Sequence, residues 1–233
     1  MTFAGIADRE AIENEMPWAE RNFATTLYGM LTNTAEAFPA HSAISYQIFS
    51  DPASKAETLT WTQLKNRTTQ CANLLRGLGI GPTDVVAYVL PNATETVVAL
   101  LGGATAGIVN PINPLLDADQ IGAILRETGA KVVITLRPFP KTDVAQKVAA
   151  AVALAPNVKT VLEVDLLNHV SGIKSLIIPL IRPKADKAPG VTYKSFNAEV
   201  AKQSTTLDFE DVQEDRVACY FHTGGTTGMP KVA

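Results

Sequence analysis

The sequence predicts an α/β protein with a parallel-rich sheet and flanking helices. Between about residues 59 and 164, short apolar runs alternate with segments whose apolar residues recur at helical spacing, which is typical of repeated strand and crossover-helix units. The chain has 233 residues, of which 46% are hydrophobic and 18% are charged, so it has the apolar content to bury a sizeable core. The same composition excludes a disordered polymer.

A helix and a buried strand open this series. Thr60 and Gln63 have the spacing of a capping box, apolar residues follow on one helical face, and Gly79 ends the expected helix. Residues 85–90 are continuously apolar, as in a strand that is buried on both faces. A second helix, made of small and apolar residues, is expected over Thr94–Ala106.

Two further units repeat the pattern. Asp117 and Gln120 again have capping-box spacing and precede an apolar stripe, after which a strand is expected over residues 131–135. A third stripe at residues 144–155 precedes a strand near residues 159–164. Three consecutive units of this kind predict a parallel sheet.

The flanking regions are less regular. Before the first unit we expect a helix over residues 26–37 and a hairpin of two strands, 43–49 and 57–61, joined by a polar loop. Between residues 165 and 216 the periodicity weakens, and prolines with scattered lysines indicate surface excursions around one short helix near residues 196–202.

Two apolar stretches are the candidates for membrane contact. Residues 96–116 are uncharged, but paired glycines and two Asn-Pro steps interrupt them well short of the ~20 apolar residues of a membrane span, so we expect a buried helix followed by a turn. Residues 173–181 are also apolar and could lie on a membrane or a partner, although so short a run more often covers a local core. No stable membrane insertion is expected.

Charge, cysteines and histidines exclude several classes of protein. With 20 basic and 23 acidic residues the net charge is −3, so nucleic acid is not an expected partner. Cys71 and Cys219 lie in apolar contexts and are expected to be reduced core residues. His41, His169 and His222 lack metal-ligand spacing, so no metal site is predicted from them. The first residues lack the pattern of a secretory signal, and a cytoplasmic location is expected.

The densest chemical signal lies near residue 230. Residues 217–222 predict a strand that runs directly into Thr223-Gly-Gly-Thr-Thr-Gly-Met-Pro-Lys231. Glycines let backbone N–H groups approach anionic oxygens, hydroxyl groups add hydrogen bonds, and the lysine neutralises charge. The spacing fits neither the Walker loop nor the dinucleotide-binding glycine pattern. We therefore expect a polyphosphate ligand, the alternative being a flexible glycine-rich turn.

This motif resembles the phosphate-binding signature of the adenylate-forming superfamily, which includes acyl-CoA synthetases, firefly luciferase and nonribosomal peptide adenylation domains. Gly224 stands where many members carry serine, as in fatty acyl-CoA synthetases, and Val232 stands where glycine usually follows the lysine. The resemblance covers about residues 60–135 and 217–231. Its upstream segments, in the family's order, are Thr60-Trp-Thr-Gln-Leu64, Gly79-Ile-Gly-Pro-Thr-Asp-Val-Val86, Leu90-Pro-Asn92 and Ala106-Gly-Ile-Val-Asn-Pro-Ile-Asn-Pro114.

The resemblance implies that residues 1–233 are the N-terminal portion of the large AMP-binding domain, with the rest of that domain and the C-terminal domain absent from this chain. It implies an AMP-forming acyl-CoA synthetase, an acid-thiol ligase that uses ATP, Mg²⁺ and coenzyme A. Such an enzyme converts a carboxylic acid, here a fatty or otherwise hydrophobic one, to an acyl-adenylate and then to a thioester. This portion alone is expected to be inactive, and the oligomeric state stays open.

The same resemblance assigns roles to single residues. Lys231 would be catalytic, because it would stabilise the departing pyrophosphate. Two alternatives remain open at this point: a stand-alone nucleotide- or polyphosphate-binding module, and an adenylation domain that loads a carrier protein. The residues expected around the β- and γ-phosphates are Thr223, Gly224, Gly225, Thr226, Thr227, Gly228 and Lys231.

Overall fold

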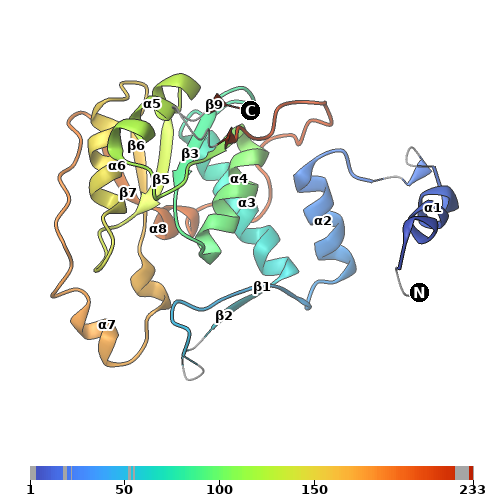
Figure 1. The fold of residues 1–233 in the computed structure, drawn as a ribbon, viewed down its shortest axis with the longest axis horizontal. Helices are drawn as coiled ribbons and strands as arrows, with labels where there is room; N and C mark the ends of the chain where they lie inside the picture. Colours follow the sequence, from blue (N-terminus) through green and yellow to red (C-terminus); the bar gives the residue numbers. More distant parts are fainter. Residues whose placement is uncertain are drawn as a thin grey trace.

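A five-stranded parallel sheet organises the chain (Figure 1). The computed structural model describes residues 4–17, 20–21, 23–51, 54, 56–223 and 231–232. Each neighbouring pair of strands is parallel, which confirms the predicted fold class. The strand order is β4-β3-β5-β6-β7, formed by β3 (Val85–Val89), β4 (Ile108–Pro111), β5 (Val132–Leu136), β6 (Thr160–Val164) and β7 (Thr192–Ser195).

Two pairs of helices cover the sheet. The order of strands reverses between β4 and β5, so right-handed crossovers carry the helices before and after that point to opposite faces. In Figure 1, α3 and α4 pack together on one side of the sheet and α5 and α6 on the other. The helices are α3 (Trp61–Gly77), α4 (Thr94–Ala106), α5 (Ala118–Thr128) and α6 (Val144–Ala153).

The capping signals in the sequence are realised in the structure. The Thr60 side chain accepts from the Gln63 N–H at the start of α3, and Asp117 does the same for Gln120 at the start of α5. Gly129 ends α5 with a φ of 66°, a left-handed conformation that favours glycine. These local contacts explain why both helix starts were predicted correctly.

The interface between α3 and α4 is tightly packed. A Cβ added at Gly102 of α4 would lie only 2.7 Å from both Cβ and Sγ of Cys71, so the helices touch at backbone distance. Cys71 is fully buried and reduced, as predicted, and burial raises the pKa of its thiol to about 12. Cys219 is also a free thiol but is only half-buried, which corrects its expected place in the core.

The N-terminal region adds two helices and a hairpin. The strands β1 and β2 pair antiparallel, with Tyr46 opposite Glu57, as expected from the two short strands and the polar loop. The helix α1 was not predicted, because none of its residues is buried and its pattern shows no apolar face. These elements are α1 (Ile6–Glu15), α2 (Leu27–Ala37), β1 (Ser42–Tyr46) and β2 (Glu57–Thr60).

Three expectations require correction. The turn expected after α4 is the buried strand β4, which ends at an Asn-Pro step. The excursion after β6 also contains a strand, β7, and two unpredicted helices besides α8, which was predicted. Residues 173–181 do not cover a local core, because only Ile178 among their large side chains is buried. The excursion helices are η2 (Leu166–His169), α7 (Ile173–Ile177) and α8 (Phe196–Val200).

Within the part of the chain that the structure describes, no helix is both long enough and apolar enough to cross a membrane.

Candidate functional site

An extended segment beside β4 carries the glycine-rich motif. The Val109 N–H donates to the Ala218 carbonyl at 3.0 Å, and the Tyr220 N–H donates to the Val109 carbonyl at 2.9 Å. These bonds form a parallel bridge between Val109 and Cys219, so the segment runs in the same direction as β4. The strand predicted over residues 217–222 is therefore mostly an extended segment at the edge of the sheet, joined to β4 by a single bridge. The motif begins at the carboxyl end of this edge, where α/β sheets bind their ligands.

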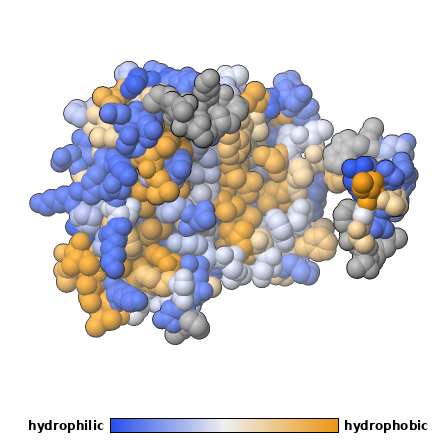
Figure 2. Space-filling view, viewed as in Figure 1, coloured by the Kyte–Doolittle hydropathy of each residue, from blue (hydrophilic) through white to orange (hydrophobic). Residues whose placement is uncertain are grey.

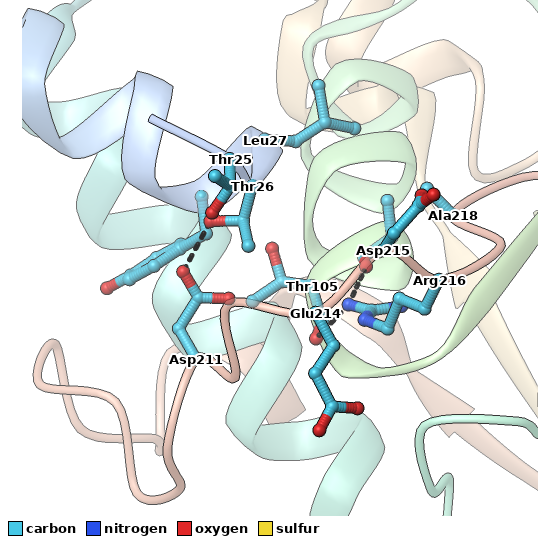
Figure 3. A pocket seen from close by; sticks show the side chains of 11 residues that line it. Thr25, Thr26, Leu27, Thr105, Asp211, Glu214, Asp215, Arg216 and Ala218 are labelled. Atoms are coloured by element: carbon cyan, nitrogen blue, oxygen red, sulfur yellow. Dashed lines mark hydrogen bonds between the residues drawn. The ribbon is translucent and has the colours of Figure 1, made fainter. Parts of the chain in front are cut away.

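Arg216 fixes the start of this segment (Figure 3). Its guanidinium donates to the carbonyls of Ala104, Thr105 and Gly107 at 2.6, 3.1 and 2.8 Å. Those carbonyls are at the C-terminal end of α4, where a helix leaves acceptors unsatisfied and a cation is favourable. Arg216 therefore ties the chain ahead of the motif to the end of a buried helix.

The residues before Arg216 are tied to the start of α2. Figure 3 shows Asp211 and Thr26 facing each other, and the Thr26 hydroxyl donates to the Asp211 carboxylate. Thr26 also caps α2 by accepting from the Gly29 N–H at 2.9 Å. A cleft of about 110 Å³ lies between these elements, lined by the acidic residues Glu214 and Asp215 among others.

Asn110 and His222 contact each other at the base of the motif. Asn110 is fully buried in β4, and its side-chain amide donates to the Tyr220 carbonyl at 2.9 Å and lies 3.3 Å from Nδ1 of His222. Burial lowers the pKa of His222, so its imidazole is neutral at pH 7 and Nδ1 accepts from the amide. The remaining proton is then on Nε2, which is buried and has no partner among the described residues.

The two ends of the motif are paired across a short antiparallel hairpin. Thr223 belongs to β8 (His222–Thr223) and Lys231 to β9 (Lys231–Val232), and their backbones lie opposite each other. The backbones of the two ends of the motif therefore lie side by side. The other predicted ligand-binding residues, Gly224, Gly225, Thr226, Thr227 and Gly228, lie outside the described residues.

A second polar cluster, which sequence reasoning missed, lies at the N-terminus of α4. Nε2 of His169 is 2.9 Å from Glu95, and Asn197 donates to the same carboxylate at 2.8 Å. The side chains of Glu95 and His169 are only 4% and 5% exposed. The Tyr46 ring packs edge-on against His169, and Glu57 approaches its other nitrogen at 3.6 Å. We call these five residues the His169 cluster.

Mutual contact sets the ionisation of the His169 cluster. Burial by itself would lower the pKa of His169, but the hydrogen bond to Glu95 and the charges of Glu95 and Glu57 raise it overall. Burial would likewise raise the pKa of Glu95, yet its bonds to His169 and Asn197 lower it overall. The folded state therefore favours the ion pair. The only sign of the His169 cluster in the sequence is Glu95, an acidic residue in the first turn of the apolar helix α4.

The His169 cluster borders a cavity of about 310 Å³ between α3, α4, η2 and α8. Thr94 Oγ1 and Asn197 Oδ1 border it and have no hydrogen-bond partner among the described residues. Among the described residues, no group of three or more His, Cys, Asp or Glu side chains is placed so that it could hold a metal ion. Through these contacts the His169 cluster joins β2, α4, η2 and α8.

Comparisons with known proteins identify the family. The family model of AMP-binding enzymes matches residues 31–233, and the chain belongs to this family of adenylate-forming enzymes. It is 28% identical over 234 residues to marinolic acid–CoA ligase of Pseudoalteromonas sp., covering 98% of this chain and 32% of that enzyme. It is 28% identical over 228 residues to long-chain-fatty-acid–CoA ligase of Bacillus subtilis, covering 94% of this chain and 37% of that enzyme. The chain thus spans about a third of the length of these relatives.

A shorter stretch of this chain is similar to a peptide synthase. Over 101 residues the chain is 37% identical to a linear gramicidin synthase of Brevibacillus parabrevis, a match that covers 41% of this chain and 2% of that protein. Among solved structures, the chain resembles the anthranilate CoA ligase AuaEII in complex with anthranoyl-AMP, with a TM-score of 0.69 and 21% identity. That match covers 93% of this chain and 36% of that one. It shows a shared fold.

Proposed function

We propose that residues 1–233 form the N-terminal portion of the large AMP-binding domain of an acyl-CoA synthetase. The whole enzyme would activate a fatty or otherwise hydrophobic acid with ATP and transfer it to coenzyme A. The observation that carries this proposal is the sequence motif Thr223–Lys231, which follows an extended segment at the edge of the sheet, in a chain whose long matches are CoA ligases. The glycine at position 224, as in fatty acyl-CoA synthetases, favours the hydrophobic acid.

The donor set of the motif suits the triphosphate of ATP. Thr223, Gly224, Gly225, Thr226, Thr227, Gly228 and Lys231 would supply backbone N–H groups, hydroxyl groups and one ammonium to the β- and γ-phosphates. ATP supplies the leaving pyrophosphate when the acid's carboxylate attacks its α-phosphorus. The backbones of Thr223 and Lys231, at the two ends of the motif, lie opposite each other, which supports a common phosphate site for these two residues. Mg²⁺ would reach the site with the phosphates, and no described residue is assigned to it or to coenzyme A.

Asn110 and Arg216 would act as positioning residues in this proposal. Asn110 fixes the segment that enters the loop through its bond to the Tyr220 carbonyl, and Arg216 fixes the same segment further upstream. Neither residue needs to touch ATP. Their loss would misplace the loop and slow the reaction without changing its chemistry.

A second candidate is an adenylation domain that loads a carrier protein. It is favoured by the 37% identity to the linear gramicidin synthase, although that match covers less of this chain than the CoA ligase matches do. The two candidates share the adenylation step and differ in the thiol that accepts the acyl group. A panel of acids with ATP and either coenzyme A or a phosphopantetheinylated carrier protein separates them.

The test uses the complete protein and the exchange of labelled pyrophosphate into ATP. Lys231→Ala is expected to slow acid-dependent exchange by about 10- to 1,000-fold, on the scale of losing one donor that stabilises developing charge. The matched control is Lys202→Ala, which removes an exposed lysine that pairs only with Glu199 among the described residues. Equal exchange by both variants would remove Lys231 from the mechanism. Exchange with no thioester on either acceptor would overturn the ligase assignment.

A further inference from the structure

The cavity beside the His169 cluster lies at the carboxyl ends of the sheet strands. Glu95 comes after β3, His169 after β6 and Asn197 after β7, so the ends of three strands bring these side chains together. Figure 1 shows α8 beside α3, and the cavity lies between these helices, α4 and η2. Open α/β sheets bind ligands outside the carboxyl ends of their strands. The cavity therefore has the position of a ligand site.

Four ionised side chains line the cavity, and their charges cancel. Glu95 pairs with His169 at 2.9 Å, and Arg67 donates to Glu57 at 2.9 Å. An ion of either sign would therefore meet a like charge beside each opposite one. Separating the pair of Glu95 and His169 would be costly, because both side chains are nearly buried. The charge pattern thus favours a ligand without net charge.

Three buried polar atoms of the residues that line the cavity have no hydrogen-bond partner among the described residues. They are Oγ1 of Thr94, Oδ1 of Asn197 and Oε2 of Glu57. The Glu57 oxygen is 3.6 Å from Nδ1 of His169, which is too far for a hydrogen bond. Thr94 is only 1% exposed. All three atoms accept hydrogen bonds, and a buried acceptor without a donor costs free energy. They favour a ligand with several hydrogen-bond donors.

Apolar side chains form another part of the cavity wall. Val98, Phe196 and Val200 line it and are each at most 5% exposed. Figure 2 shows that the apolar side chains exposed on the viewed face gather elsewhere, at the lower left over α7, whose residues do not line the cavity. Arg67, whose side chain is 39% exposed, and the exposed Ala201 also line the cavity, so a ligand can enter from solvent. The wall therefore offers an apolar contact surface next to polar atoms, as small-molecule sites do.

We propose that this cavity binds a neutral, hydroxyl-rich molecule of the size class of a monosaccharide. Its hydroxyl groups would donate to Thr94, Asn197 and Glu57, and its C–H groups would pack on Val98 and Phe196. The volume of about 310 Å³ lies at the lower end of the range for small-molecule sites. The site shares no residue with the glycine-rich motif, and the inference does not depend on the proposed reaction.

The experiment measures saturation-transfer NMR and thermal unfolding of the complete protein. D-glucose and myo-inositol are the neutral probes, and D-glucosamine and D-glucuronate are charged probes of similar size. A neutral probe is expected to bind and to raise the melting temperature, and the charged probes to bind more weakly. Thr94→Val keeps the shape of the side chain and removes the hydroxyl, so it should weaken binding by about three- to tenfold. It should not lower the melting temperature of the free protein, because that hydroxyl has no described partner.

The matched control is Thr68→Val. Thr68 is fully buried in α3 and its hydroxyl also lacks a partner among the described residues, but it does not line the cavity, so binding should equal that of the wild type. Ala201→Trp, at the exposed rim, should narrow the cavity and abolish binding. Three results would overturn the proposal: binding of neither neutral probe, equal or tighter binding of a charged probe, or unchanged binding by Thr94→Val. Binding that persists in Lys231→Ala would support it independently of the proposed function.

Discussion

The sheet and the excursion that follows β6 are stabilised in different ways. Every position of β3 and β5 is buried, and their apolar side chains share one core with those of α3, α4, α5 and α6. The excursion, residues 165–200, returns to the sheet as β7 and buries Leu166, Phe196 and Val200 in the core, and it adds directional polar contacts. His169 and Asn197 bond to Glu95, and Arg182 bonds to Asp165. Apolar burial changes little with pH, whereas ion pairs depend on it. The part of the excursion outside β7 should therefore open first and respond to pH, while the sheet determines global stability.

The largest expected effect tests the sheet. Ile134 of β5 is fully buried, and Ile134→Ala should destabilise the protein by about 3–4 kcal/mol, because it removes buried methyl groups and leaves a cavity. Urea unfolding measures the loss, and native-state hydrogen exchange should accelerate across all strands. Leu154→Ala, at an exposed site, is the control and should cost well under 1 kcal/mol. Acceleration confined to the excursion would contradict the assignment of global stability to the sheet.

The next effect tests the excursion. Glu95→Ala leaves His169 and Asn197 without their partner and should cost about 2–3 kcal/mol, less than the core cavity, because the excursion opens locally and water reaches the orphaned groups. Hydrogen exchange should accelerate mainly over residues 165–191 and 196–200, on either side of β7. Glu95→Gln keeps a side-chain oxygen in the same place and should cost about half as much. If exchange accelerated equally in β3 and β5, the excursion would not be a separate opening unit.

This difference also explains what the sequence could predict. The helix starts at Thr60 and Asp117 depend on residues three positions away, and the glycine-rich motif is contiguous, so local patterns were sufficient to find them. The bond between Glu95 and His169 joins residues 74 positions apart, and the sequence around one residue contains no pattern that indicates contact with the other. Three histidines without metal spacing gave no reason to pair one of them with a glutamate.

The strand β4 was missed for a related reason. It has four residues and ends in an Asn-Pro step, which locally favours a turn. Its identity as a strand depends on β3 on one side and on residues 218–220 on the other, more than a hundred positions away. The side-chain bond from Asn110 to the Tyr220 carbonyl is part of the same distant pairing. The pairing of β4 with distant segments thus outweighs the local preference of the Asn-Pro step for a turn.

The smallest effect is the pH dependence of the His169 cluster. The pKa of His169 is raised above its ordinary value of about 6.5, so the cluster stabilises the fold fully below that value and loses this contribution as pH rises through the raised one. The pKa of Glu95 is lowered, so its contribution is lost only as pH falls through that lowered value. The cluster is therefore most stabilising in mildly acidic solution.

Thermal unfolding of the wild type and His169→Gln, from about pH 5 to pH 9, measures this contribution directly. The wild type should have the higher melting temperature near pH 5–6, and the difference should shrink as the imidazole loses its proton. Because Glu95, Glu57 and Arg67 all face His169, a Glu57→Gln variant in the same series should lower the pH at which the difference shrinks. A difference that stayed constant or grew with pH would show that packing of the ring against Tyr46, rather than its charge, connects the excursion to the sheet.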